Sequence, residues 1–413
     1  MADIRPFGAI RPAKEYAKDI AALPYDVYNR EEACAEVKGK PYTFLRIDRA
    51  ETNFDDTVDT YDERVYDKAS ELLSGMVEGG QFIRDNKPCY YIYELTMDGR
   101  IQTGIVAASS VDDYDNSIIK KHENTLAEKE IDRIHHVDTC SAQTGPIFLA
   151  YRDRDVIDEV VNRVKTGSAE YDFTSEDGVR HRVFVIDDDN DIKIIQDEFA
   201  KTDSIYIADG HHRCASAVKV SKMRRKAKGN YTGDEEFNYF LSVLFPDEQL
   251  KILDYNRVLK DMNGHDIDEL LDTMGEVFTF IREDSKPINP AKKGEVSLYD
   301  GATWRLYEIK TQYTSNDPVD GLDVALLQDL ILEPFFGIHD PKADDRIDFV
   351  GGIRGLEELE RRCKTDSKVA FAMYPTDISE LFAVADANRL MPPKSTWFEP
   401  KLRSGLFIHE IER

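Results

Sequence analysis

The sequence has few cysteines and no long apolar run, and both shortages exclude classes of protein. Its five cysteines are scattered along 413 residues. None forms a Cys-x-x-Cys pair, which argues against a disulfide framework or a structural zinc site. No apolar run approaches the roughly 20 residues that a membrane-spanning helix needs. The first residues lack the charged and then apolar segments of a secretory signal. We therefore expect a soluble, cytoplasmic protein without a membrane segment.

Positive charge is also scarce. The chain has 54 Lys and Arg against 80 Asp and Glu, a net charge of −26, and the acidic residues are spread along its whole length. Such a surface repels nucleic acid, whose binding depends on clustered Lys and Arg. General DNA or RNA binding is therefore disfavoured. Any ligand that carries phosphate needs a local positive pocket, so each cluster of Lys, Arg or His is a candidate site.

Alternating strand and helix patterns predict an α/β fold with a mixed sheet. Apolar runs at 90–95 and 102–107 flank Asp98-Gly99, which predicts an antiparallel hairpin. Later strands are separated by helix-length connections, which favours parallel pairing in part of the sheet. Residues 56–78 have the apolar spacing of one long helix.

At roughly 100–200 residues per domain, the length predicts two or three domains. We expect an N-terminal α/β region over 1–110, a core over 111–260 and a C-terminal α/β region over 261–413.

The most informative local sequence is Asp209-Gly210-His211-His212-Arg213, which joins an apolar strand to a helix expected over 212–228. A helix N-terminus has unpaired amides and a positive dipole end, so it can bind an anion. Gly210 permits a sharp turn, and Arg213 can hold phosphate oxygens by paired hydrogen bonds. His211 and His212 can donate further bonds, and Asp209 can hold Mg²⁺ or a substrate hydroxyl. The pattern favours a phosphate site over an ordinary turn.

A second candidate stretch is Lys120-Lys121-His122-Glu123-Asn124-Thr125. Glu123 is a candidate general base and Lys121 a candidate phosphate contact. A solvated, charged helix start explains this stretch at least as well when it is taken alone. The chain also has histidines at 122, 135, 136, 211 and 212, enough in number for a metal site. Because adjacent residues point in different directions, a dedicated transition-metal site is disfavoured.

Two later stretches offer weaker signals. Gly351-Gly352-Ile353-Arg354-Gly355 lies between a strand and a helix but lacks the complete P-loop pattern, so a packing or turn role is favoured. Lys394-Ser395-Thr396 and Lys401 offer donors in a proline-framed segment, and a structured tail with exposed lysines is an equal alternative.

The Asp209 turn resembles the phosphate motif of the ParB/sulfiredoxin superfamily, in which a Gly-x-His/Arg-Arg turn opens a helix and binds nucleotide phosphates. Within it, the chain is similar to a bacterial and archaeal family of unknown function labelled SpoOJ/ParA/ParB/RepB-like. The segments 23–27, 122–125 and 391–396 extend this likeness over nearly the whole chain. The resemblance implies a ParB/sulfiredoxin-like core with flanking helices and an additional C-terminal α/β region.

The superfamily includes free serine kinases. The resemblance therefore implies a nucleotide-dependent phosphotransferase that acts on a small hydroxyl-bearing metabolite such as free serine. Its cofactors would be Mg²⁺ and a nucleoside di- or triphosphate. The implied nucleotide-binding residues are Gly210, His211, His212, Arg213 and Lys121. The implied catalytic residues are Glu123 as the base, Asp209, which also holds Mg²⁺, and His212.

Two alternatives stay open. A ParB-like switch or sensor would bind a nucleotide through the same turn without turning it over. A metal-dependent hydrolase would use the histidines. Sulfinic-acid reduction is disfavoured because His211 stands where sulfiredoxin has a cysteine. Chromosome partitioning is disfavoured because this acidic chain shows no clear counterpart of the DNA-binding helices of ParB.

Overall fold

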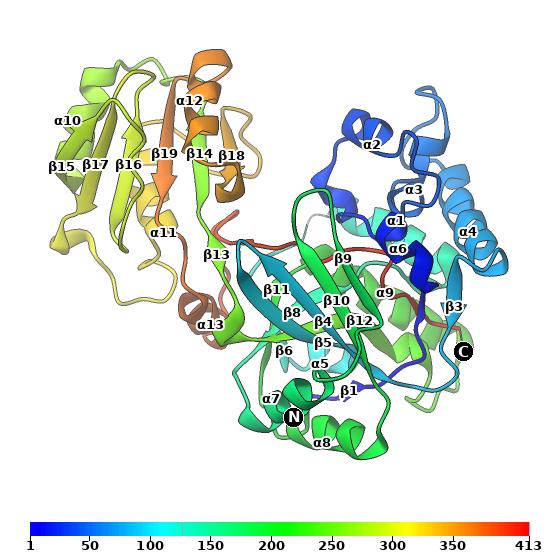
Figure 1. Cartoon of the computed structure of the whole chain (residues 1–413). Helices are drawn as coiled ribbons and strands as arrows, with labels where there is room; N and C mark the ends of the chain where they lie inside the picture. The colour runs from blue at the N-terminus through cyan, green and yellow to red at the C-terminus, as the bar shows by residue number, and fades with distance from the viewer. Residues whose placement is uncertain (126, 413) are drawn as a thin grey trace. The chain divides into compact units, whose positions relative to one another are not determined.

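The computed structural model describes residues 1–125 and 127–412 and shows two compact units (Figure 1). The first unit is Met1–Leu250 together with Pro400–Arg413, and the second is Lys251–Glu399. The chain thus leaves the first unit, builds the second and returns. The sheet of the first unit takes strands from both sides of residue 110. The α/β fold class expected from the sequence is confirmed.

A nine-stranded mixed sheet forms the centre of the first unit. β4 and β5 form the expected antiparallel hairpin, in which Asp98 and Gly99 both have positive φ, as a tight two-residue turn requires. Parallel pairing joins β12 to β8 and β11 to β6. Across the sheet the strands are β6 (Ile119–Lys120), β11 (Ile205–Asp209), β8 (Ile147–Tyr151), β12 (Tyr239–Pro246), β5 (Arg100–Ser110), β4 (Tyr90–Met97), β10 (Arg180–Ile186) and β9 (Tyr171–Thr174), with β1 (Ile4–Arg5) beside β5.

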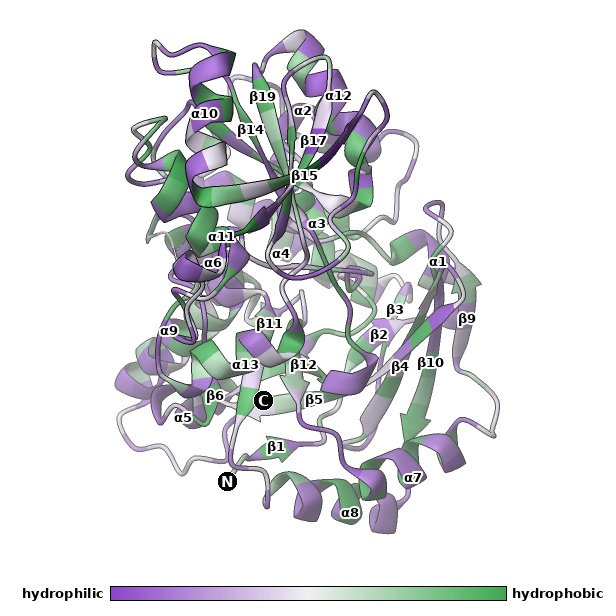
Figure 2. Cartoon of the chain, turned by 90° about the vertical axis from the view of Figure 1, so that its left-hand side faces the viewer, coloured by the Kyte–Doolittle hydropathy of each residue, from purple (hydrophilic) through white to green (hydrophobic). Residues whose placement is uncertain are grey.

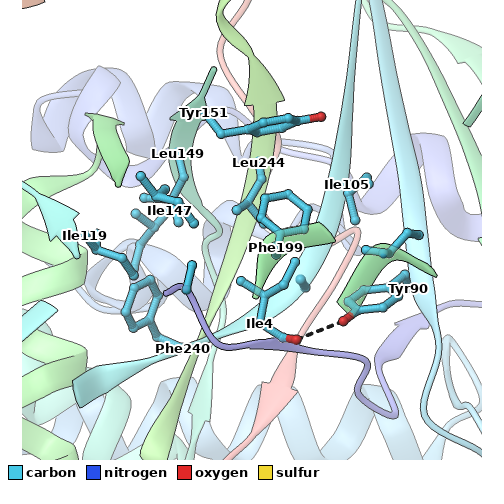
Figure 3. Packing of buried hydrophobic residues seen from close by; sticks show 14 of the residues in the cluster. Ile4, Tyr90, Ile105, Ile119, Ile147, Leu149, Tyr151, Phe199, Phe240 and Leu244 are labelled. Carbon is cyan, nitrogen blue, oxygen red and sulfur yellow. Dashed lines mark hydrogen bonds between the residues drawn. The ribbon is translucent and has the colours of Figure 1, made fainter. Parts of the chain in front are cut away.

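The main core of this unit combines sheet residues with residues of the helices α7 (Asp155–Val164), α8 (Asp189–Phe199) and α9 (His211–Lys228). Apolar and polar residues alternate along α7 and α8 (Figure 2), as expected when one helix face is buried. Figure 3 shows Phe199 of α8 packed among strand residues such as Ile105 and Leu244. Tyr90 keeps its hydroxyl satisfied inside this core by donating to the Ile4 carbonyl at 2.9 Å.

A second cluster of helices belongs to the same unit. Its long members are α4 (Glu63–Glu78), α6 (Ala127–Cys140) and α9 (His211–Lys228), with the short α1 (Ala17–Ile20), α2 (Arg30–Glu36), α3 (Leu45–Asp48) and α5 (Val111–Asp115). The helix expected over 56–78 begins only at Glu63. The reason is that Asp55 and Asp59 accept hydrogen bonds from nearby turn amides, and Asp62 then caps α4.

The second unit contains a six-stranded antiparallel sheet. Its order is β15 (Phe278–Asp284), β17 (Trp304–Ile309), β16 (Glu295–Tyr299), β19 (Val369–Met373), β14 (Tyr255–Leu259) and β18 (Ile347–Gly351). Its helices are α10 (Ile267–Val277), α11 (Asp323–Leu327), α12 (Leu356–Thr365) and α13 (Ile378–Asp386). Val258, Val350 and Trp304 belong to its core, together with Leu356 and Leu359 of α12.

No helix in the part of the chain that the structure describes is long and apolar enough to cross a membrane.

The buried carboxyl of Asp113 makes the stability of the first unit depend on pH. Asp113 accepts a hydrogen bond from the Asp3 amide at 2.7 Å, and burial raises its pKa to about 6. In the unfolded chain the pKa is about 3.9, so the folded state holds the proton more tightly. This stabilisation is complete below pH ~4 and is lost as the pH rises through 6.

We therefore predict that Asp113→Asn, which keeps an acceptor but has no charge, is more stable than wild type at pH 7.5 by up to about 3 kcal/mol. The difference should vanish near pH 4. Urea unfolding at both pH values measures it. Asp203→Asn at an exposed position is the matched control. Parallel pH profiles for wild type and Asp113→Asn would contradict the prediction.

Candidate functional site

The Asp209 turn lies where β11 ends and α9 begins. Gly210 is the only residue between them and has φ +93°. A Cβ atom at this position would lie 3.1 Å from Nε of Arg213, whose side chain folds back over the turn. Glycine is required on both grounds, because it tolerates the left-handed backbone and leaves room for the guanidinium.

The first backbone amides of α9 lie before its hydrogen-bond ladder. The Cys214 amide donates to the Gly210 carbonyl at 2.9 Å and closes the first helical turn. The amides of residues 211–213 precede the helical ladder and have no acceptor within it. The first turn contains no acidic side chain, so the positive end of this 18-residue helix is not neutralised from within.

Arg213 is the best-positioned cation of the turn. Its side chain is only 10% exposed. Nη1 donates to the Pro146 carbonyl, and Nη2 donates to Oδ2 of Asp209 at 3.4 Å. Nε is buried and has no hydrogen-bond partner among the described residues. A buried donor without an acceptor costs about 1–3 kcal/mol, so an acceptor brought by a ligand would stabilise this arrangement.

Asp209 is ionised at neutral pH. Burial alone would raise its pKa, but Lys401 and Arg213 outweigh burial and hold the pKa at about 2. Lys401 comes from the returning C-terminal segment, and its Nζ lies 3.5 Å from Oδ2 of Asp209. Both cation contacts are longer than the ~2.8 Å of a strong charge-assisted hydrogen bond. The carboxylate and the two cations can therefore also bind a ligand.

The imidazole of His211 points into the interior. It packs at 89° against the ring of His122 with 4.5 Å between centroids, and both residues are buried. The His122 amide donates to Nε2 of His211 at 3.5 Å. Burial lowers the pKa of both rings, to about 4 for His122, so both are neutral at pH 7. The His211 side chain thus belongs to a buried contact and is not directed at a ligand beside the turn.

The structure brings the Lys121–Thr125 segment beside the turn. Because β6 pairs with β11 in parallel, the segments that follow the two strands emerge at the same end of the sheet. The contact between His122 and His211 joins these segments directly. Lys121 is exposed and Glu123 is half-buried in this loop, while His212 is half-buried on α9. The two motifs singled out in the sequence are therefore neighbours.

Three further residues, Tyr25, Asp48 and Arg133, line the space beside Arg213. Arg133 of α6 stacks over the ring of Tyr25 at 4.1 Å, and Asp48 accepts a hydrogen bond from Thr144 at 2.8 Å. Together with Arg213, these residues line a small cavity. Tyr25 lies in a segment that contributed to the family resemblance. Asp48 lies in no motif, and Arg133 precedes His135 and His136, which the sequence offered only as possible metal ligands. Only folding brings Asp48 and Arg133 to the turn.

A larger cavity of about 310 Å³ shares Tyr25, Asp48 and Arg133 with the small one. It extends to the side chains of Tyr28, Tyr61 and Tyr66. Its volume falls at the lower end of the range for small-molecule sites, ~300–1,000 Å³. Its lining combines aromatic rings with charged groups of both signs. Within residues 1–125 and 127–412, no three His, Cys, Asp or Glu side chains are gathered so that they could hold a metal ion.

The chain belongs to a family described as proteins of unknown function, DUF1015, whose model matches residues 4–325. No curated protein matches it. Similar solved structures include a free serine kinase in complex with AMP, at 15% identity and a TM-score of 0.33, covering 74% of this chain and 91% of that chain. Another is C-terminally truncated SbnI from Staphylococcus aureus, at 12% identity and a TM-score of 0.36, covering 71% and 82%. Identities and TM-scores this low do not assign an activity. Membership of the ParB/sulfiredoxin superfamily stays a prediction.

The backbone conformations of Gly210 and Gly75 predict that alanine has opposite effects on stability at these two positions. Gly210→Ala should lower the free energy of unfolding by about 1–2 kcal/mol, because alanine is strained in the left-handed region. Gly75→Ala in α4 should raise it by about 0.5–1 kcal/mol, because Gly75 has open space and lies within a helix. Chemical unfolding of both variants measures the effects. Equal stability of Gly210→Ala and wild type would show that the turn is not constrained.

Proposed function

We propose that this protein is a nucleotide-dependent phosphotransferase that acts on a small hydroxyl-bearing metabolite, with free serine as the first candidate. The observation that supports this proposal is the environment of Arg213. A buried guanidinium with one unsatisfied N–H lies across a glycine at the start of a long helix. In a chain with a net charge of −26, this is a local positive site of the kind that a phosphate group requires.

The surroundings of the turn fit a nucleoside di- or triphosphate. The first amides of α9, at residues 211–213, and the guanidinium of Arg213 would supply donors for phosphate oxygens. Lys121 and His212 lie on the two segments that meet there and are the next candidates for phosphate contacts. The adjoining cavity of about 310 Å³ offers the rings of Tyr25, Tyr61 and Tyr66 to the remainder of the ligand.

Asp209 suits a Mg²⁺ ion that arrives with the nucleotide. Its carboxylate is ionised and lies at the same turn as the phosphate donors. Magnesium in such sites uses one or two protein carboxylates and completes its shell with phosphates and water. A full cage of protein ligands is therefore not needed. The ion would neutralise charge on the phosphates.

In this mechanism the chain mainly positions groups and stabilises charge, as phosphoryl transfer requires. Arg213 and the α9 amides hold the transferring phosphate. Glu123 orients the substrate hydroxyl and accepts its proton as the hydroxyl oxygen bonds to the terminal phosphorus. The bond from that phosphorus to the bridging oxygen breaks, and the shortened nucleotide leaves with the electron pair. Asp209 organises the cations of the turn through its contacts with Arg213 and Lys401. His212, beside Arg213 on α9, is a candidate to stabilise charge that develops on the phosphate.

Removal of the Arg213 side chain tests the nucleotide site. A ligand that binds only the folded state raises the melting temperature. We predict that ATP, ADP, CTP or GTP with Mg²⁺ shifts the melting temperature of wild type and that Arg213→Ala loses this shift. Lys226→Ala, which removes an exposed cation from the same helix, is the matched control.

Arg213→Lys separates the loss of a phosphate contact from a folding defect, because lysine keeps the positive charge but cannot donate paired hydrogen bonds. It should retain part of the shift. A full shift in Arg213→Ala would refute the proposed site. No shift in wild type with any nucleotide would refute the function.

Glu123→Gln separates catalysis from binding. If Glu123 is the base, we predict a loss of turnover of about 10²–10⁴-fold with nucleotide affinity unchanged. ADP formation from ATP in the presence of serine measures turnover, and calorimetry measures binding. Glu128→Gln, at an exposed position in the first turn of α6, is the control. Unchanged turnover in Glu123→Gln would exclude this role. Binding without turnover in wild type would instead indicate a nucleotide-dependent switch.

A further inference from the structure

The second unit contains a buried cation, Arg257, that has no carboxylate partner among the described residues. Arg257 lies on β14 and is 3% exposed. Nη1 donates to the Tyr255 carbonyl and Nη2 to the Lys394 carbonyl at 3.2 Å, and the guanidinium lies over the Phe349 ring at 5.3 Å. Buried charges are normally paired, because removing an ion from water costs several kcal/mol. Among the described residues, the hydrogen-bond acceptors of this guanidinium are carbonyl oxygens.

The nearest acidic residue along the strand is directed elsewhere. Successive side chains of an extended segment point to opposite faces, which places Asp254 and Asn256 on one side and Arg257 on the other. Asp254 accepts a hydrogen bond from Asn256 at 2.5 Å. Its carboxylate also lies close against Gly352, where a Cβ atom would be only 2.1 Å from Oδ1. Asp254 is thus held away from the guanidinium.

Arg257 holds a strained turn that carries a second cation. Lys394 has φ +57°, a left-handed conformation that costs a non-glycine residue about 1 kcal/mol or more. The turn is fixed by the bond from Arg257 to the Lys394 carbonyl and by a 2.6 Å bond from Ser395 Oγ to the Pro392 carbonyl. Thr376 binds the Ser395 carbonyl at 2.9 Å. Such strain persists where the surroundings impose it, and it is frequent at binding sites.

Aromatic side chains border this turn. The Lys394 ammonium lies 5.7 Å from the centre of the Tyr255 ring. The Tyr255 ring in turn contacts Trp397 at 5.1 Å and Phe349 at 5.9 Å. Trp397 lies flat against Gly351, where a Cβ atom would be 2.7 Å from the indole. These rings form an apolar border on one side of the exposed Lys394 side chain.

We propose that the turn Pro392–Ser395 is an anion-binding site of the second unit, where Lys394 contacts a phosphate or carboxylate group beside Tyr255. Arg257 is a positioning residue, which fixes the turn and adds a second positive charge beneath it. Burial lowers the pKa of Arg257 to about 10, consistent with a charge that lacks a counter-ion. A bound anion supplies that counter-ion. This proposal rests on the residues of the second unit alone and does not depend on the proposed nucleotide turn.

The test uses the full chain with Arg213→Ala as background, so that binding at the first unit does not contribute. Calorimetric titration with inorganic phosphate and with malonate represents the two anion classes. We expect at least one probe to bind and Lys394→Met to weaken it tenfold or more. Lys364→Met, an exposed lysine of α12, removes the same charge from the same unit and should change nothing. The probe that binds more tightly identifies the class.

Binding of neither probe would overturn the proposal, as would equal affinities in the Lys394→Met and Lys364→Met proteins. Arg257→Gln then tests the positioning role. Glutamine keeps donors for the carbonyls but removes the buried charge. We expect anion affinity to fall at least threefold while the melting temperature without ligand is unchanged or higher. A lower melting temperature with unchanged affinity would show that Arg257 only supports the fold.

Discussion

The proposed site depends on the packing of the Arg213 guanidinium across Gly210. This contact needs a left-handed residue without a Cβ atom at the end of β11. It also needs acceptors on both sides of the guanidinium, and these come from Asp209 and from Pro146 just before β8. Because β8 and β11 are antiparallel neighbours, the start of one strand lies beside the end of the other. One side chain therefore connects the sheet register to the start of α9.

Charge balance around this contact explains how an acidic chain keeps a positive site. Asp209 offsets Arg213 and Lys401 only partly, through contacts of 3.4 and 3.5 Å. The nearby histidines, His122 and His211, are neutral because burial lowers the pKa of both. They therefore pack on each other without repelling the cations. The helix dipole adds to the positive potential, since no acidic side chain stands in the first turn of α9.

The sequence was informative wherever local patterns decide structure. The hairpin at Asp98-Gly99 and the strand–glycine–helix order at Asp209 follow from backbone preferences and apolar spacing. The helix expected over 212–228 begins one residue earlier in the structure, since α9 starts at His211. One residue corresponds to about 100° of rotation around a helix. Adjacent histidines therefore point in different directions, and the contact with His122 places the His211 ring in the interior. The sequence does not predict that contact, because it joins two distant segments.

The sequence also does not predict contacts between segments that are far apart along the chain. Asp48, Arg133 and Lys401 come from distant segments, and no spacing rule links them to the turn. The helix expected from residue 56 shows a different limit, because aspartate side chains competed successfully for the backbone amides before Glu63.

Arg213 and Arg257 show where an added negative charge has the greatest effect. Arg213 has a carboxylate of its own chain within reach, so an incoming phosphate must share the guanidinium with Asp209. Arg257 is bound only by carbonyl oxygens and lacks an acidic partner in the described chain. Burial removes both guanidinium groups from water, but the protein places a carboxylate beside Arg213 and only carbonyl acceptors beside Arg257. The free energy gained from an added negative charge should therefore be larger at Arg257 than at Arg213, for an anion that binds beside Lys394. A buried cation without a counter-ion is thus stronger evidence for a ligand than a buried ion pair.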